Sequence, residues 1–463
     1  MNDIVNESIN RSKEVNKELN AFVTILDNPE YHENPNSLLN GVPYSAKDMF
    51  STKGILTTGS SNALKDYVPF YDATVIKRLK EAGAILISKS AGDEFGLGGT
   101  GTTPHTGVVR NPYDKNRQAG GSSSGSAVSV ATSSSVFALG TDTGDSVRKP
   151  AAFCGIVGFK PTYGVIPRYG VLPFASSLDH VGVFARSVKE VSTVVDAIKG
   201  PDGKDMTCVP KMDDFTPLLD GNIKGKKLFY IKEICNLEYY ENQTNELKET
   251  ITLFNQTLDK LRELGFEVVE ESINQKILNA IFPTYQVISC AEATSNLSMY
   301  TGIIYGPRGT GNNINDMVKD YRSKGFSSLI KRRLVIGSYV LQKENQERYF
   351  LNAARARRLI VDTFNNLFKK YDGFITMASG EGAPLLDESG EVLTNKSVLE
   401  NHLAIANFGG YPSITIPNGY VNNLPVAVNI TGAALDDANI LNIAYALESV
   451  LNFKSNLEGG NNE

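Results

Sequence analysis

The sequence predicts an α/β fold in a single large mixed domain. Short apolar runs alternate with longer helix-like stretches along the 463 residues. No internal repeat and no flexible linker longer than a few residues interrupts this alternation. A chain with 41% apolar and 21% charged residues can bury a large core. We therefore expect one domain over residues 1–457 and a disordered tail at 458–463.

The expected elements begin with an N-terminal helix. Residues 1–20 alternate charged and amide side chains with apolar ones such as Val5 and Ile9, which suits an amphipathic helix and excludes a secretory signal. Three apolar runs are expected to be strands: Ala84 to Ser88, Val136 to Gly140 and Leu228 to Ile231. Two longer stretches are expected to be helices: Asn245 to Gly265 and Asp437 to Leu451.

Charge and cysteine content exclude several classes of protein. The net charge is −5 and basic residues are scattered, so the sequence lacks the basic stripe of a direct nucleic-acid binder. Two short basic runs, 331–333 and 355–358, are interpreted as solvated helix faces. No apolar run reaches membrane-spanning length. The four cysteines lie far apart, which predicts neither disulfides nor a zinc site and favours a reducing cytoplasm.

Residues 119–146 are crowded with serine and glycine, a composition that is also typical of flexible linkers. Linkers, however, do not carry apolar residues at buried-type spacing, as Val128, Val130 and Leu139 do here. Small residues also let helix and sheet backbones approach closely. We therefore interpret this segment as part of the folded core.

The first of three generic motifs in this half of the chain is a dinucleotide-binding pattern. Gly96 to Gly101 matches its glycine spacing and follows an expected strand. The residues after it contain Pro104 and Pro112, which prevent the helix that such a site requires. A nucleotide fold of this kind is not expected.

Two further patterns each propose a serine nucleophile. In the Gly-x-Ser-x-Gly pattern, Ser123 would be the nucleophile and His180 or His402 its base, although a lone histidine is more often structural. In the Ser-x-x-Lys pattern, Lys149 would activate Ser146, but Pro150 follows at once and the companion motifs are missing. Neither pattern is decisive.

Three long motifs, in order and in register, resemble the amidase-signature enzymes. These are GVPYSAKD with Lys47, GGSSSGSA with Ser122, and GTDTGDSVRKPAAFCGIVGFKPTYG with Ser146. Ser122 follows Lys47 by 75 residues and Ser146 follows Ser122 by 24, as in the family. The resemblance runs from about Leu19 to about Phe453. It implies a single large mixed β-sheet flanked by helices.

The resemblance also implies a catalytic triad. Ser146 would be the nucleophile, Ser122 a proton relay held in a cis peptide, and Lys47 the base. Serine is a poor nucleophile until a base takes its proton, and lysine is a base only if burial lowers its pKa well below about 10.4. The alternative role for Lys47 is a surface ion pair with Asp48.

The turn before Ser146 is the expected oxyanion hole, formed by Thr143, Gly144 and Asp145. Its backbone N–H groups precede an expected helix start and can converge on a tetrahedral oxyanion. The family pattern has glycine at Asp145 and again at Ser124. A carboxylate beside an oxyanion repels the developing charge unless its side chain turns away. We expect a working site whose rate Asp145 can lower.

Other segments resemble one branch of the family, the glutamine-hydrolysing subunits of tRNA-dependent amidotransferases. They begin at Gly200, Ser289, Lys331 and Asn407. In that branch the subunit hydrolyses glutamine and supplies ammonia for the transamidation of glutamyl-tRNA. The partner that binds the tRNA activates the glutamate with ATP and magnesium, and a small linker subunit completes a heterotrimer. The resemblance therefore implies no cofactor or metal on this chain, and only indirect contact with tRNA.

By residue-by-residue carry-over, three side chains would contact glutamine. Arg333 matches the arginine that binds the α-carboxylate, and a bidentate guanidinium suits that group. Tyr285 matches a substrate-facing tyrosine. Glu400 falls where the family has an aspartate that binds the α-ammonium group.

Two other functions stay open at this point. A stand-alone amidase acting on small aliphatic or aryl amides would share Lys47, Ser122 and Ser146 and need no partner. A structural subunit that has lost activity is the non-catalytic alternative, and Asp145 is the only hint of it.

Overall fold

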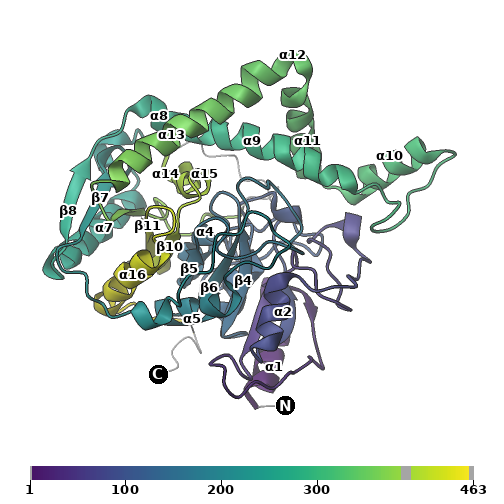
Figure 1. Cartoon of the computed structure of the whole chain (residues 1–463), viewed down its shortest axis with the longest axis horizontal. Coiled ribbons are helices and arrows are strands. Elements are labelled where there is room, and N and C mark those ends of the chain that lie inside the picture. The colour runs from purple at the N-terminus through teal and green to yellow at the C-terminus, as the bar shows by residue number, and fades with distance from the viewer. Residues whose placement is uncertain (1–2, 387–397, 458–463) are drawn as a thin grey trace.

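One mixed sheet of eleven strands runs through the residues that the computed structural model describes, 3–386 and 398–457 (Figure 1). The strand order is β1-β3-β2-β4-β6-β5-β10-β11-β9-β7-β8. The strands are β1 Phe22–Ile25, β2 Pro43–Lys47, β3 Ile85–Ser90, β4 Phe137–Asp142, β5 Val157–Lys160, β6 His180–Ala185, β7 Lys227–Ile231, β8 Glu267–Glu271, β9 Gly373–Met377, β10 Ser413–Val421 and β11 Leu424–Thr431. The predicted large mixed sheet is confirmed.

Helices flank this sheet in several packed groups. They are α1 Asp3–Leu19, α2 Thr74–Glu81, α3 Ser124–Ala131, α4 Arg148–Cys154, α5 Val188–Ile198, α6 Lys232–Cys235, α7 Asn245–Glu263, α8 Gln275–Asn279, α9 Ile281–Asn296, α10 Ile314–Gly325, α11 Ser328–Leu341, α12 Lys343–Gln346, α13 Asn352–Phe368, α14 Val398–Asn401, α15 Ile405–Phe408 and α16 Asp437–Leu451. Helix α16 contacts α5 and α7 and packs on β10, whereas α3 contacts α4 and packs on β4. The flanking helices expected from the resemblance are thus present.

Strand pairing places the carboxyl ends of β2 and β4 next to each other, and the candidate catalytic residue Lys47 lies at the first of these ends. Strand β2 pairs in parallel with both β3 and β4, whereas β4 and β6 are antiparallel. Ala46 on β2 lies opposite Leu139 on β4, so the carboxyl ends of these two strands lie side by side. Lys47 is the last residue of β2 and Asp142 the last of β4. Every residue of both strands is buried, so the site rests on a rigid part of the core.

The serine- and glycine-rich segment is part of this core. All residues of α3 are buried. A side chain at Gly125 would meet the Ala21 carbonyl oxygen at 2.0 Å, so only glycine allows this close approach. The linker alternative is therefore wrong.

The helices predicted from periodicity are present. Helix α16 has the predicted bounds, α7 ends two residues before the predicted Gly265, and α1 fills most of residues 1–20. Val5 and Ile9 of α1 pack with Ile85 and Ile87 of β3, which accounts for the amphipathic pattern of the N-terminal segment.

A helical layer made by α9, α11 and α13 lies beside the sheet, and α10 extends from it to the right in Figure 1. Helices α9 and α11 pack closely. The space beside Gly337 on α11 is so narrow that a side chain there would meet the Cys290 carbonyl oxygen of α9 at 2.1 Å. Tyr285 on α9 and Arg333 on α11 are thus held on two adjoining helices.

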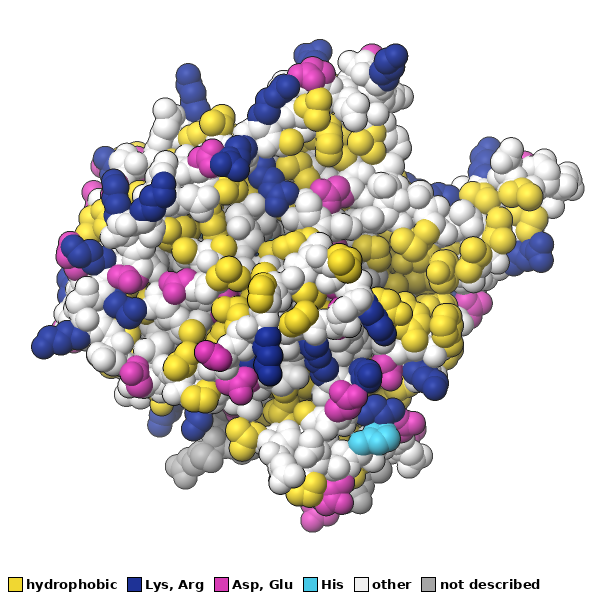
Figure 2. Space-filling model, viewed as in Figure 1, with side chains coloured by type: hydrophobic (Ala, Val, Ile, Leu, Met, Phe, Trp, Pro, Cys, Tyr) yellow, Lys and Arg dark blue, Asp and Glu magenta, His cyan; other side chains and the backbone are white. Residues whose placement is uncertain are grey.

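The surface carries mixed charge. Figure 2 shows Lys and Arg side chains interspersed with Asp and Glu on the face drawn, without a basic stripe. In the described ranges, none of the helices is both long and apolar enough to cross a membrane. The predicted disordered tail, 458–463, lies outside the described residues, and the assignment of 1–457 to one domain stays a prediction.

Candidate active site

The Lys47 side chain lies at the centre of the candidate site and is fully buried. Its Nζ donates hydrogen bonds to Ser122 Oγ at 2.7 Å and to Thr141 Oγ1 at 2.8 Å. The neighbouring Asp48 instead accepts hydrogen bonds from Thr58 and the Ser60 backbone and lies beside Lys89. The surface ion pair considered for Lys47 is therefore wrong.

Burial lowers the pKa of Lys47 to about 7, and the charges of Asp93, Asp142 and Asp179 oppose that shift. The ammonium form is disfavoured because it would have to give up water in this interior. Near neutral pH a large fraction of the amine is therefore uncharged and able to accept a proton from the hydroxyl that it contacts.

Backbone contacts hold Ser122 next to this amine. The Gly121–Ser122 peptide bond is cis. The Ser122 carbonyl accepts a hydrogen bond from Asp93 N at 3.0 Å. A side chain at Gly92 would meet that carbonyl oxygen at 2.3 Å, so the loop can lie here only against a glycine.

Ser146 is buried, with 3% of its surface exposed, and lies in the loop between β4 and α4. Its carbonyl accepts a hydrogen bond from Ser123 N at 3.2 Å, which places the nucleophile candidate alongside the serine loop. Lys47 and Ser122 are in direct contact, and Ser146 is held next to them through the backbone.

The loop before α4 presents free backbone donors. Among the described residues, the N–H groups of Thr143, Gly144, Asp145 and Ser146 find no acceptor. The Gly144 carbonyl accepts a hydrogen bond from Arg148 Nη2 at 2.8 Å. In a trans peptide the N–H points away from the carbonyl, so this bond directs Asp145 N–H to the opposite side. Such unpaired, fixed donors are what an oxyanion hole requires.

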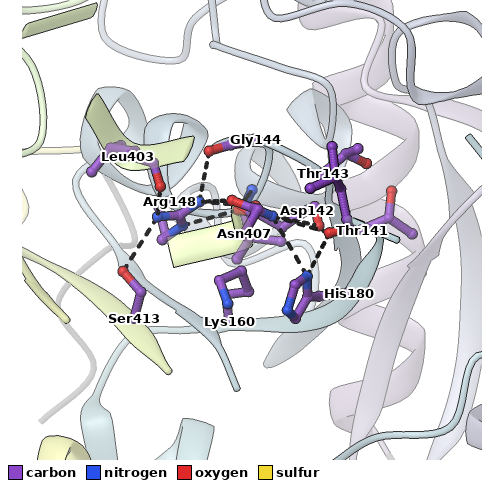
Figure 3. Close-up of polar contacts among 12 residues, drawn as sticks. Thr141, Asp142, Thr143, Gly144, Arg148, Lys160, His180, Leu403, Asn407 and Ser413 are labelled. Carbon is purple, nitrogen blue, oxygen red and sulfur yellow. Dashed lines mark hydrogen bonds and ion pairs between the residues drawn. The ribbon is translucent and has the colours of Figure 1, made fainter. Parts of the chain in front are cut away.

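A buried ionic cluster behind this loop, shown in Figure 3, was not predicted. Arg148 is fully buried and donates to both carboxylate oxygens of Asp142 at 3.1 and 3.0 Å. It also donates to Asn407 Oδ1 at 2.7 Å and to the Leu403 carbonyl at 2.7 Å. Although burial works against it, Arg148 holds the pKa of Asp142 well below its usual range. The signal available in the sequence was that Asp142 and Asp145 are the only charged residues in the segment 119–146.

The predicted substrate-binding residues Tyr285 and Arg333 lie on the other side of the loop. A side chain at Gly144 would meet Tyr285 Cε2 at 2.9 Å, so the tyrosine ring packs on the loop of residues 143–146. Burial raises the pKa of the Tyr285 hydroxyl, Arg333 opposes that shift and Asp145 adds to it. Arg333 Nη1 is buried without a hydrogen-bond partner in the described part of the chain. A guanidinium in that state needs an anion.

Glu400, the third predicted substrate contact, has a partner within the chain. Its Oε2 accepts a hydrogen bond from Lys149 Nζ at 3.0 Å, and its carbonyl accepts another from the same Nζ at 3.2 Å. Burial opposes it, but Lys149 lowers the pKa of Glu400. The predicted contact between Glu400 and an ammonium group stays a prediction.

A cavity of about 250 Å³ is lined by Thr141 of β4 and by Thr143 of the loop that follows it. Thr143 Oγ1 donates to Asp179 Oδ1 in its wall at 2.7 Å. Burial raises the pKa of Asp179 to about 6, although hydrogen bonds from Thr143 and the Ala175 backbone oppose the shift. Neither Thr141 nor Asp179 was predicted, because nothing local in the sequence connects them to Lys47.

The competing serine assignments have no structural support. Ser123 Oγ donates to the Thr141 carbonyl at 3.0 Å. His180 and His402 make short contacts to the Leu178 and Leu399 carbonyls and none to Ser123. The Ser-x-x-Lys assignment also fails, because Lys149 bonds Glu400.

The glycine motif at 96–101 does not open a helix. Residues 97–123 form turns and loops, and the next helix begins at Ser124. Asp93 accepts hydrogen bonds from the backbone of Thr100 and Gly101, so the motif folds around a carboxylate of its own chain. The prediction against a dinucleotide site agrees with this geometry.

Comparison with known proteins identifies the family. The amidase family model matches residues 3–441. A glutamyl-tRNA(Gln) amidotransferase subunit from Pseudothermotoga lettingae is 37% identical over 446 residues, which cover 96% of this chain and 93% of that protein. The crystal structure of a glutamyl-tRNA(Gln) amidotransferase subunit from Thermotoga maritima is similar with a TM-score of 0.82, at 33% identity, covering 98% of this chain and 92% of that one. A peptide amidase from Stenotrophomonas maltophilia has a TM-score of 0.78 at 25% identity, with 96% and 92% coverage. This chain therefore belongs to the amidase family.

Proposed function

We propose that this protein is the glutamine-hydrolysing subunit of a glutamyl-tRNA(Gln) amidotransferase. The observation that carries the hydrolytic part is the buried Lys47 amine, which has a pKa of about 7 and lies 2.7 Å from Ser122 Oγ, in a loop that is bonded to Ser146 through the Ser123 backbone. The choice of glutamine is supported by the unpaired Arg333 guanidinium and by similarity to subunits of enzymes with that name.

In the proposed reaction, Ser146 Oγ bonds to the carboxamide carbon of glutamine. Its proton passes to Ser122 Oγ as the Ser122 proton passes to Lys47 Nζ. The oxygen of the tetrahedral intermediate takes up the negative charge and accepts hydrogen bonds from the free N–H groups of residues 143–146.

Collapse of the intermediate breaks the carbon–nitrogen bond. Lys47 returns its proton through Ser122 to the leaving nitrogen, which departs as ammonia and leaves an ester on Ser146. Water then attacks the ester through the same relay, which yields glutamate and free Ser146. Each proton that Lys47 accepts is returned within the cycle.

The proposal extends to a heterotrimer. The ammonia would pass to a tRNA-binding subunit that uses ATP and magnesium to convert Glu-tRNA(Gln) into Gln-tRNA(Gln), and a small linker subunit would join the two. The assembly as a whole would be a ligase, with tRNA touching this chain only indirectly. The mixed surface charge fits a chain that does not itself bind nucleic acid. A cytoplasmic location fits its four free cysteines.

A stand-alone amidase is the second candidate, favoured by the similarity to a peptide amidase. The test is ammonia release from glutamine and from propionamide, with and without the partner subunits, and with Ser146→Ala as the blank. Release from glutamine that rises with partners, ATP and glutamylated tRNA supports the amidotransferase. Cleavage of propionamide without partners, with glutamine ignored, would establish the stand-alone amidase.

A further inference from the structure

Apart from Asp179 and the Arg148 cluster, four charged side chains act on the nucleophile loop, residues 143–146, or on the Tyr285 ring packed against it, and two of the four satisfy each other. Lys149 on α4 and Glu400 on α14 form an ion pair at 3.0 Å, with only 5% of the lysine side chain and 30% of the glutamate side chain exposed. Their charges cancel locally. The charges left over are those of Asp145 and Arg333.

The Asp145 carboxylate is half-buried and takes part in no hydrogen bond or ion pair within the described ranges. It stands between Gly144, which packs on the Tyr285 ring, and the nucleophile Ser146. Burial raises the pKa of its carboxyl to about 6, and Lys149 opposes the shift. Holding a half-buried carboxylate without a partner costs free energy of folding unless a ligand supplies a cation.

Arg333 is the matching cation without a partner. Its Nη1 is buried and unsatisfied, and its charge acts on the same Tyr285 hydroxyl on which Asp145 acts. One free carboxylate and one free guanidinium around one tyrosine are the complement of a zwitterion. An α-amino acid carries that pair of charges.

Resting on the function proposed above, we infer that Asp145 binds the α-ammonium group of glutamine, and that Glu400 instead holds Lys149 away from it. Asp145 also flanks the oxyanion hole, where its negative charge opposes the transition state. A bound ammonium group neutralises that charge. Substrates with an α-amino group would therefore gain in turnover as well as in affinity, which makes Asp145 a specificity-determining residue.

The experiment compares L-glutamine with glutaramate, which keeps the carboxamide and the carboxylate but lacks the amino group. The full chain with its partner subunits is measured as wild type, Asp145→Asn and Glu400→Gln. Asp145→Asn is expected to lower kcat/KM for glutamine roughly ten- to hundredfold, the range for a hydrogen bond to a charged group. It should speed glutaramate cleavage, because the charge that opposes the oxyanion is removed and this substrate has no ammonium group to lose, so the preference for glutamine collapses. Glu400→Gln should lower that preference less than Asp145→Asn does, because it only frees Lys149 from its ion pair. Asp145→Glu, which keeps the carboxylate, should retain part of the preference.

The inference is overturned if Asp145→Asn keeps the wild-type preference, or if Glu400→Gln is the variant that abolishes it. Failure of the proposed function gives a different result, because the wild type would then cleave neither compound while still cleaving propionamide.

Discussion

The two sides of the nucleophile loop differ in how completely their polar groups are paired. Behind the loop, Arg148 and Asp142 are fully buried and bonded to each other and to Asn407. In front of it, Arg333 Nη1 and the Asp145 carboxylate have no partner among the residues described. Paired buried charges position the backbone, whereas unpaired ones await a ligand. The predictions below test that division of roles.

The largest expected effect is on the base. Lys47→Met should lower ammonia release from glutamine by up to roughly 10⁴-fold, because the proton of the relay then has no acceptor. The free energy of unfolding should change by no more than about 3 kcal/mol, the cost of leaving buried hydroxyls unpaired. Activity assays and denaturant titration of the same preparation check both values. A catalytic role for Lys47 would be contradicted if the variant lost ammonia release only because most of it was unfolded in the denaturant titration.

On the paired side, Arg148→Met should lower the free energy of unfolding by about 3–5 kcal/mol, because the buried Asp142 charge loses its counter-ion. Activity should fall as well, since the Gly144 carbonyl loses its hydrogen bond from Arg148 and the Asp145 N–H is no longer held in its direction. The matched control is Arg358→Met, which breaks an exposed pair with Asp362 and should cost about 1 kcal/mol or less. Similar losses in the two variants would show that the cluster does not hold the loop.

On the unpaired side, Arg333→Ala should raise KM for glutamine roughly ten- to hundredfold, because one charged contact to the carboxylate is lost. Stability should change little, since Nη1 has no partner to lose within the described part of the chain. KM for 4-aminobutanamide, which keeps the carboxamide and the amino group of glutamine but lacks the carboxylate, serves as the control and should not change. An unchanged KM for glutamine would contradict the proposal that Arg333 binds the glutamine carboxylate.

The smallest effect comes from pH. Lys47 must be neutral to accept a proton, and its pKa is lowered to about 7. The rate should therefore be level above pH 7 and fall about tenfold per unit below it, as the fraction of free amine falls. A pH–rate profile for kcat/KM measures this. A rate that rises as the pH falls below 7 would exclude Lys47 as the base.

Elements set by local periodicity were predictable from the sequence. Helix α16 was predicted from Asp437 to Leu451, and the helical period of an apolar face is visible in any such segment. Family motifs supplied the mixed sheet and the candidates Lys47, Ser122 and Ser146. The structure brings the first two into contact and the third alongside.

Contacts between distant segments were not predictable. The bonds from Arg148 to Asn407 and from Lys149 to Glu400 join residues more than 250 positions apart, and no local pattern encodes such pairs. The basic run 355–358 was interpreted as a solvated face. That is wrong for Arg357, which is half-buried and donates to the Phe408 carbonyl at 3.0 Å.

The central claim is that Ser146, rather than Ser123, is the nucleophile of a glutaminase. The most direct test is to treat the full chain, with its partner subunits, with an electrophilic glutamine analogue and to locate the adduct by peptide mass spectrometry. We predict one adduct, on Ser146, that is absent in Lys47→Met and prevented by excess glutamine. An adduct on Ser123, or full glutaminase activity without any adduct on Ser146, would contradict the mechanism.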